Sequence, residues 1–286
     1  ASYMLDVSEL SIPEDFIAKI IQAEEENDQA TISKFKNFWT LVSLNPDSRV
    51  RNNLFWFIRK WDMNITESGL IIAYRNADLK KEAKYSSEDT KAIINAFYQE
   101  KYINHTDPSR VTMKIGNKNR TISEMYNEII NGADSPIYTD CPSHTTTIKL
   151  GQPVRIPREE CDSDQEHSCS SGLHVGAKGW LSKGYFGNVG LMVLVNPANV
   201  VAVPTIDEYG KMRTCEYFPI AIIDFDESGN IIEPPYSLYN DIAYLKELKY
   251  DGSINNVDYD NYEISNIYSN REDVYDSILA RLNADR

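Results

Sequence analysis

The chain has 286 residues, which is enough for one large domain or two modest domains with a real hydrophobic core. Its 42% hydrophobic and 25% charged residues exclude a wholly disordered or collagen-like chain. A net charge of −14 argues against nucleic-acid binding, because an acidic protein repels phosphates unless basic residues are segregated, and no basic patch stands out.

Residues 1–62 form a predicted helical region. Pro13 and the two acidic residues after it suit a first helical turn, and apolar residues between 16 and 21 form a stripe at helical spacing. The same spacing recurs from residue 35 to 42 and ends near Asn45-Pro46. Asp47 then caps a third predicted helix, so we expect a compact helical layer.

Residues 63–147 combine a strand with a helical insertion. Leu70 to Arg75 reads as a strand, and Ser86 caps an amphipathic helix. The polar stretch from 102 to 120 is predicted to be a loop or short hairpin. Thr121 and Glu124 have capping-box spacing and open a short helix that ends near Gly132.

Residues 148–225 are the predicted β-rich core. Short strands at 145–150 and 153–157 lead to an acidic loop and then to the apolar run Val189–Val195, which is typical of a strand buried on both faces. A turn at 196–199 leads into a strand at 200–203, and residues 212–223 complete the sheet with a bulge or edge at Pro219.

Residues 226–286 read as an acidic appendage rich in Tyr and Asn, with short helices such as the one around Ile278. From Asp224 to the end, 14 acidic residues face 5 basic ones, a net charge of −9. The predicted fold class is α+β: an N-terminal helical layer, a mixed and mainly antiparallel sheet, and this appendage.

No apolar run approaches the roughly 18–20 residues of a membrane-spanning helix, and the N-terminus lacks signal-peptide features. Four cysteines in a chain of this length do not suggest a disulfide scaffold, so reduced thiols are expected. These features predict a soluble protein inside the cell, with peripheral membrane contact left open.

Two metal sites can be weighed against plainer interpretations. Zinc prefers thiolate and imidazole ligands, but structural zinc sites usually show two tight pairs, and here only one is present. The residues considered for zinc are Cys141, His144, Cys161, His167, Cys169 and His174. Alternating acids at 162, 164 and 166 imitate a calcium loop, yet the required Gly and the closing Glu are missing. We therefore expect no metal and no cofactor, and a solvated acidic loop.

A third candidate is nucleophilic or transferase chemistry, because a Cys–His pair can form a thiolate nucleophile; the residues concerned are Cys169, His174, Arg213, Cys215 and Glu216. The spacing does not show that such a pair meets. The order of Tyr74-Arg75, Gly172-Leu-His174 and Glu216 is similar, in pattern only, to ADP-ribosyltransferase folds. No catalytic residue is predicted.

Three blocks carry a resemblance to a known family: residues 169–175 (CSSGLHV), 195–204 (VNPANVVAVP) and 211–217 (KMRTCEY). In these blocks the chain resembles the RIIB-like proteins of tailed bacteriophages, the family of the T4 protector from prophage-induced early lysis. Weaker support upstream puts the resemblance at residues 45–78 and 150–223, with an insertion between them. The helix-turn-helix-like N-terminal region of that family has no evident counterpart here, and the acidic tail is extra.

The resemblance implies a phage accessory protein that protects infection against a resident prophage, with a RIIA-like partner and host-membrane association. We predict a non-enzymatic RIIB-like interaction protein in the host cytoplasm, with a homo-oligomer left open. The alternatives are a virion component, bound to other virion proteins, and an ADP-ribosyltransferase-like or other nucleotide-processing enzyme. The predicted binding residues are Cys169, Gly172, His174, Lys211, Arg213 and Glu216, where Lys211 and Arg213 offer a cationic edge for an acidic group.

Overall fold

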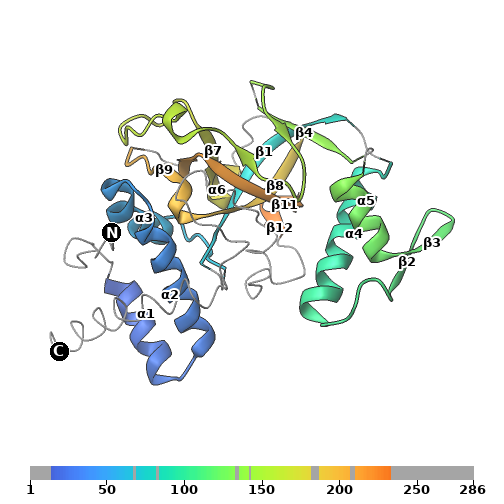
Figure 1. The fold of residues 1–286 in the computed structure, drawn as a ribbon, viewed down its shortest axis with the longest axis horizontal. Coiled ribbons are helices and arrows are strands. Elements are labelled where there is room, and N and C mark those ends of the chain that lie inside the picture. Colours follow the sequence, from blue (N-terminus) through green and yellow to red (C-terminus); the bar gives the residue numbers. More distant parts are fainter. Residues whose placement is uncertain are drawn as a thin grey trace.

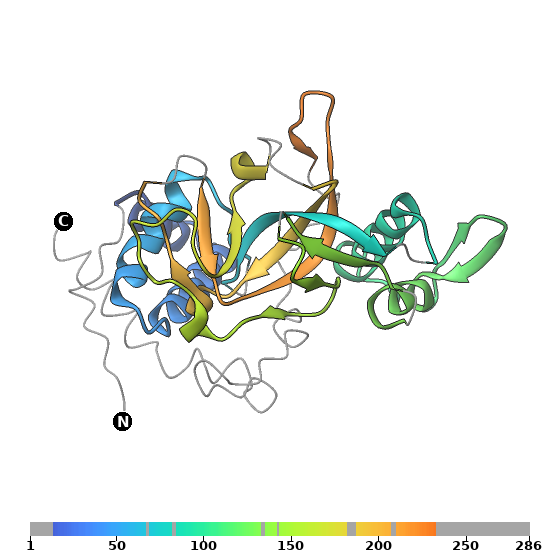
Figure 2. The same ribbon diagram turned by 90° about the horizontal axis from the view of Figure 1, so that it is seen from above.

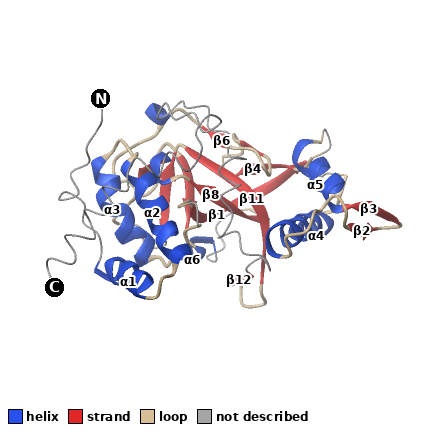
Figure 3. Cartoon of the chain, turned by 60° about the horizontal axis from the view of Figure 1, so that its bottom comes forward, coloured by secondary structure: helices blue, strands red, loops and turns tan. Residues whose placement is uncertain are grey.

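The computed structural model describes residues 14–66, 69–81, 84–132, 135–141, 143–181, 187–206 and 210–232 (Figure 1). Within these residues the chain forms a central sheet with helices at both ends, and the strands lie between the two helical groups (Figure 3). The predicted α+β class is confirmed. The predicted appendage, including its helix around Ile278, lies outside the described residues apart from its first few positions.

Three helices form the N-terminal layer: α1 (Glu14–Glu25), α2 (Gln29–Ser43) and α3 (Ser48–Lys60). Asp28 and Asp47 cap α2 and α3, because each carboxylate accepts a hydrogen bond from a backbone N–H of the first turn. The predicted helical layer is therefore confirmed, including the role of Asp47.

The three helices pack through aromatic rings. Phe55 meets Phe16 and Phe38 edge to face, with ring centroids 5.5 and 5.2 Å apart. The buried amide of Asn45 joins this layer to the sheet, since its Nδ2 donates to the carbonyls of Pro197 (2.8 Å) and Val200 (2.7 Å). The helical layer and the sheet thus share one hydrophobic core.

Every strand pairing in the ten-stranded sheet is antiparallel among the described residues. The main path runs β12-β11-β8-β1-β7-β10-β9, β4 pairs with β1 and β5, and β6 pairs with β11. The strands are β1 (Ile71–Lys81), β4 (Ile137–Asp140), β5 (Thr147–Ile148), β6 (Val154–Arg155), β7 (Leu173–Gly176), β8 (Val189–Val195), β9 (Val200–Ala202), β10 (Lys211–Thr214), β11 (Glu216–Phe225) and β12 (Ile231–Ile232).

The sheet curls back on itself. Only Cys215 separates β10 from β11 in the chain, yet four strand steps separate them along the path. At about 4.8 Å per step, a flat sheet would hold the two strands roughly 19 Å apart. The strand path must therefore bend toward a partly closed barrel. The short helical turns η3 (Arg158–Glu160), α6 (Lys178–Leu181) and η4 (Pro197–Asn199) connect its strands.

A second helical group lies at the far end of β1, away from the N-terminal layer (Figure 2). It contains α4 (Ser87–Tyr98), the π-helical turn η2 (Gln99–Ile103), the hairpin β2 (Thr112–Ile115) with β3 (Lys118–Thr121), and α5 (Ile122–Asn131). Ser86 and Thr121 cap α4 and α5 as predicted. Phe97 stacks on Tyr126 with ring centroids 3.7 Å apart, which joins the two helices.

The strand predictions need two corrections. The strands predicted at 145–150 and 153–157 shrink to β5, Thr147–Ile148, and β6, Val154–Arg155, and β4 is not among the predicted strands. The bulge at Pro219 is confirmed, since the β11–β8 register shifts between Pro219 and Ala221. Strands β1 and β4 of the 63–147 region share the sheet of the 148–225 core, and the boundaries at 62, 147 and 225 stay predictions.

Candidate functional site

Strands β7 and β10 bring three of the predicted binding residues together. His174 lies directly opposite Arg213 in the antiparallel register, and Lys211 lies opposite Gly176, two residues from His174. Because side chains alternate between the faces of a strand, His174, Lys211 and Arg213 project from the same face. Gly172 leads into β7 with φ of 141°, and a Cβ there would lie 3.4 Å from Cδ of Arg213.

Arg213 is fully buried and holds the acidic loop in place. Its guanidinium donates to the carbonyl of His167 (2.6 Å) and to that of Asp164, while its Nε has no hydrogen-bond partner. Within the described part of the chain no carboxylate forms an ion pair with Arg213 or Lys211. The hydrogen bonds of Arg213 therefore go to neutral carbonyl groups, and its charge is offset only by longer-range attraction to the Asp162 carboxylate.

Lys211 and Arg75 extend this positive region, which we call the cationic cluster and define as Arg75, His174, Lys211 and Arg213. The Lys211 ammonium donates to the sulfur of the exposed Cys169 at 2.7 Å. One Arg75 nitrogen donates to the carbonyl of His174, and its guanidinium carbon lies 5.5 Å from the centre of the Tyr217 ring.

The surrounding positive charge changes the pKa of His174. Burial, together with the charges of Lys211, Arg75 and Arg213, which disfavour a fourth positive charge, lowers the pKa of His174 to about 4. The imidazole is therefore neutral at physiological pH. Its Nε2 is buried without a hydrogen-bond partner, as are Nε of Arg75 and the hydroxyl of Tyr217. Such unpaired donors are uncommon in folded interiors.

Glu216 lies apart from the cationic cluster. Its carboxylate pairs with Arg155 of the neighbouring β6 and accepts a hydrogen bond from the Asn199 amide at 3.4 Å. Cys215, at the bend between β10 and β11, is buried and donates to the Asn199 carbonyl at 3.3 Å. Burial raises the pKa of the Cys215 thiol to about 12. Neither residue is placed to act as a base or nucleophile beside His174.

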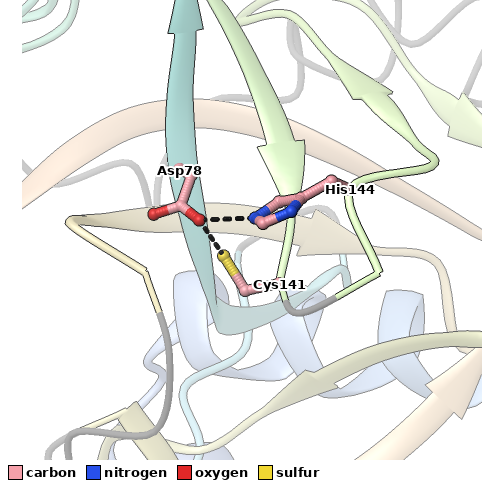
Figure 4. Close-up of side chains that lie close together, drawn as sticks. All are labelled: Asp78, Cys141 and His144. Atoms are coloured by element: carbon pink, nitrogen blue, oxygen red, sulfur yellow. Dashed lines mark hydrogen bonds and ion pairs between the residues drawn. The ribbon is translucent and has the colours of Figure 1, made fainter.

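A second cluster joins Asp78, Cys141 and His144 (Figure 4). One oxygen of Asp78, Oδ2, accepts hydrogen bonds from the Cys141 thiol at 3.0 Å and from His144 Nε2 at 2.7 Å. Asp78 lies on β1 opposite Thr139 of β4, and Cys141 follows β4 directly. Burial raises the pKa of the Cys141 thiol to about 12, and the Asp78 carboxylate adds to this effect.

The larger zinc set considered from the sequence does not assemble in the structure. His167 pairs with Asp162 at 2.7 Å, Cys161 donates to the Pro157 carbonyl, and Cys169 contacts Lys211. The sequence analysis placed Arg75 with His174 in the ADP-ribosyltransferase-like order but not among the predicted binding residues, and it missed Asp78 as a neighbour of Cys141. Both come from β1, far earlier in the chain, and only the Cys-x-x-His spacing signalled the second cluster.

The acidic loop is held by its own hydrogen bonds. Asp162 accepts from the backbone N–H of Asp164, and Asp164 accepts from that of Glu166, each at 2.9 Å. The carboxylates at these alternating positions therefore cap local turns, in keeping with the solvated loop favoured from the sequence.

Comparison with known proteins matches a segment of the chain that contains every residue of the two clusters except Arg75 and Asp78. A family model described as bacteriophage T4 protein rIIB matches residues 118–223. Protein rIIB of Enterobacteria phage T4 is 37% identical over 83 residues, which cover 28% of this chain and 26% of that protein. The resemblance predicted from the sequence is thereby confirmed. The match also covers residues 118–149, which had been predicted to be part of an insertion, and it does not reach residues 45–78.

No solved structure matches the chain. In the part of the chain that the structure describes, no helix combines the length and the apolar character needed to cross a bilayer.

Proposed function

Taking the rIIB-like segment at residues 118–223 as the premise, we propose that this chain is a bacteriophage accessory protein that acts during infection by binding a protein partner. The cationic cluster is the observation that carries the proposal. Its exposed rim is formed by Cys169, the buried Lys211 lies directly behind that rim in contact with the Cys169 sulfur, and Arg213 and Arg75 form the floor. We infer that the rim receives an acidic side chain of the partner.

The electrostatics support an acidic group at this rim. Three permanent cations surround one histidine. Arg75 forms an ion pair with the buried carboxylate of Asp140 at 4.0 Å, whereas Lys211 and Arg213 have no such pair among the described residues. Bringing a carboxylate to the rim would offset this repulsion, and a partly buried ion pair is screened less by salt than an exposed one. The contact favours a partner with acidic surface residues, such as a RIIA-like phage protein.

The same geometry gives less support to catalysis. Glu216, the carboxylate that an ADP-ribosyltransferase-like site would need, is bound to Arg155 and Asn199. Among the described residues, His174 forms no side-chain hydrogen bond with a cysteine or a carboxylate. General acid–base chemistry requires such groups within hydrogen-bond reach. A binding role therefore accounts for the residues better than a transferase role.

The proposal can be tested by affinity capture of the tagged full-length chain from infected cells. Lys211→Gln removes the cation directly behind the rim, whereas Lys118→Gln, on the β2–β3 hairpin, removes a lysine charge from an exposed position elsewhere. We expect a partner that copurifies stoichiometrically with the wild type and the Lys118→Gln variant, and is lost from a folded Lys211→Gln variant.

Three outcomes contradict the proposal. In the first, both variants retain the partner equally or lose it equally. In the second, no partner is captured at all. In the third, the chain is found at stoichiometric copy number in purified phage particles. The last outcome identifies a virion component, which was the alternative considered from the sequence. Thermal unfolding of each purified variant shows whether the loss of binding reflects unfolding.

A further inference from the structure

We propose that Asp78, Cys141 and His144 form a zinc site with three protein ligands and an exchangeable fourth position. The cluster supplies one carboxylate oxygen, one sulfur and one imidazole nitrogen, and the three atoms lie within 4.8 Å of one another (Figure 4). These are the three ligand types that zinc takes from proteins. The site is separate from the cationic cluster and is independent of the proposed partner binding.

The spacing of the donor atoms is close to that of a tetrahedral site. Zinc–ligand bonds of about 2.0–2.3 Å place neighbouring ligand atoms roughly 3.3–3.6 Å apart. Oδ2 of Asp78 lies 2.7 Å from Nε2 of His144 and 3.0 Å from the sulfur of Cys141. Outward shifts of about half an ångström, within reach of side-chain rotation, convert the hydrogen-bonded trio into a coordination shell.

The backbone fixes the ligands in advance. Antiparallel pairing of β1 with β4 sets Asp78 against Thr139, so that Cys141 emerges beside the Asp78 carboxylate. His144 has φ of 54°, and its N–H donates to the Asp140 carbonyl at 3.0 Å, which turns the chain back toward Asp78. A non-glycine residue held at positive φ is a conformation that often accompanies a functional site.

The second oxygen of Asp78 is also anchored. Oδ1 accepts the backbone N–H of Asn188 at 3.0 Å, which leaves Oδ2 directed at Cys141 and His144. Hydrogen bonds of this kind orient carboxylate ligands in metal sites. Gly187 makes room for the cluster, because a Cβ there would lie 3.0 Å from the Cys141 sulfur and 2.5 Å from the Ala77 carbonyl oxygen.

The ligand set favours zinc over other common ions. A thiolate is a poor ligand for magnesium or calcium, which prefer oxygen, whereas sulfur and imidazole together suit zinc. The His144 side chain is 56% exposed, so solvent reaches the cluster. Three protein ligands at a solvent-accessible position leave room for water as the fourth ligand.

Metal titration of the full-length protein tests the site. The chain is stripped with a chelator and titrated with Zn²⁺ by calorimetry and with Co²⁺ by absorption, since cobalt reports both thiolate ligation and tetrahedral geometry. We expect one equivalent of metal and a thiolate-to-cobalt charge-transfer band. Cys141→Ser and His144→Asn should each lower affinity at least tenfold, and Cys141→Ser should abolish the band.

A matched control is available in the same chain. His167 Nδ1 lies 2.7 Å from Asp162, which reproduces the His–carboxylate distance without a thiol, and Cys161 is a second partly exposed cysteine. His167→Asn and Cys161→Ser should leave stoichiometry, affinity and the cobalt spectrum unchanged. Cys141→Ser preserves a donor to Asp78, and metal-free thermal unfolding confirms that the variant is folded.

The proposal is overturned if the stripped wild type binds no zinc, or if the cobalt band survives Cys141→Ser and disappears with Cys161→Ser. Either result identifies the Asp78 trio as a hydrogen-bonded cluster only. The partner-capture experiment does not depend on this outcome. The partner can still copurify with the wild type and Lys118→Gln and be lost from Lys211→Gln, so the two proposals fail separately.

Discussion

Acidification should destabilise the protein through His174. Burial among Lys211, Arg75 and Arg213 lowers the folded-state pKa of His174 to about 4, against an ordinary value of 6.5. The folded state therefore favours the neutral imidazole, and the unfolded chain takes up a proton first as the pH falls. Stability contributed by neutral His174 is present above pH 6.5 and is lost progressively as the pH falls toward 4.

The size of the effect follows from the shift in pKa. A difference of about 2.5 pKa units, at about 1.36 kcal/mol each, corresponds to roughly 3 kcal/mol once the pH lies below both values. At pH 5 the unfolded imidazole is almost fully protonated and the folded one is mostly neutral, so about 2 kcal/mol is already lost relative to pH 7.

Urea unfolding at pH 7, 6 and 5 measures this loss in the wild type and in His174→Gln, whose side chain does not titrate. The wild type should lose about 2 kcal/mol more than His174→Gln between pH 7 and pH 5. Equal pH dependence in the two proteins would refute the placement of His174 among buried cations. His167→Gln is the opposite control, because the hydrogen bond that the His167 imidazole donates to Asp162 raises the pKa of His167. Its contribution is present at low pH and is lost as the pH rises through the raised value.

Three further substitutions test the packing, each by chemical unfolding of the purified variant. Asn45→Ala removes two hydrogen bonds to the carbonyls around the β8–β9 connection and should cost about 2–4 kcal/mol; a loss below 0.5 kcal/mol contradicts its role in joining helices to sheet. Phe57→Ala empties a fully buried site and should cost about 3–5 kcal/mol, and a near-neutral result would mean that α3 does not face the core. Gly187 has φ of 101°, and an added Cβ would lie 2.5 Å from a carbonyl oxygen, so Gly187→Ala should lower the free energy of unfolding by about 2 kcal/mol or more. Gly229→Ala is the control and should cost less, because its Cβ would meet nothing within 4 Å. Equal losses of stability in the two variants would contradict the close approach at Gly187.

The N-terminal helices and the capped helices could be predicted from the sequence because their signals are local. A carboxylate or hydroxyl at the cap and an apolar stripe at helical spacing lie within one short window, as at Asp47, Ser86 and Thr121. The fully buried strand β8 was equally evident, since its apolar run is too short for a helix.

Strand β4 could not be predicted because its stability comes from a distant partner. Its four residues, Ile137–Asp140, are too few to show alternation, and they pair with the end of β1. That end of β1, beyond Asn76, is partly polar and exposed, so it carries little strand signal of its own. Tertiary pairing therefore decides the conformation at both positions.

The candidate sites divide in the same way. Lys211 and Arg213 alternate on one strand and were predicted together, and the register with β7 adds His174. Glu216 was grouped with them, but the bend at Cys215 transfers it to a strand that pairs with β6 and β8. Arg75 and Asp78 enter from β1. Only the loose ADP-ribosyltransferase-like order related Arg75 to His174, and no pattern in the sequence related Asp78 to Cys141 and His144.

The position of β1 has a consequence for how the chain is made. This strand is central in the finished sheet. Its start pairs locally with Ile65, but its pairings of Ile71 with Val195 and of Tyr74 with Gly176 cannot form until those later residues are made. At roughly 5–20 residues per second, a ribosome needs on the order of ten seconds to deliver them. During that interval the apolar stretch from Leu70 to Tyr74 is exposed on the nascent chain and prone to aggregate. Packing against helices α1–α3, which are already synthesised, can bury it until the later strands arrive.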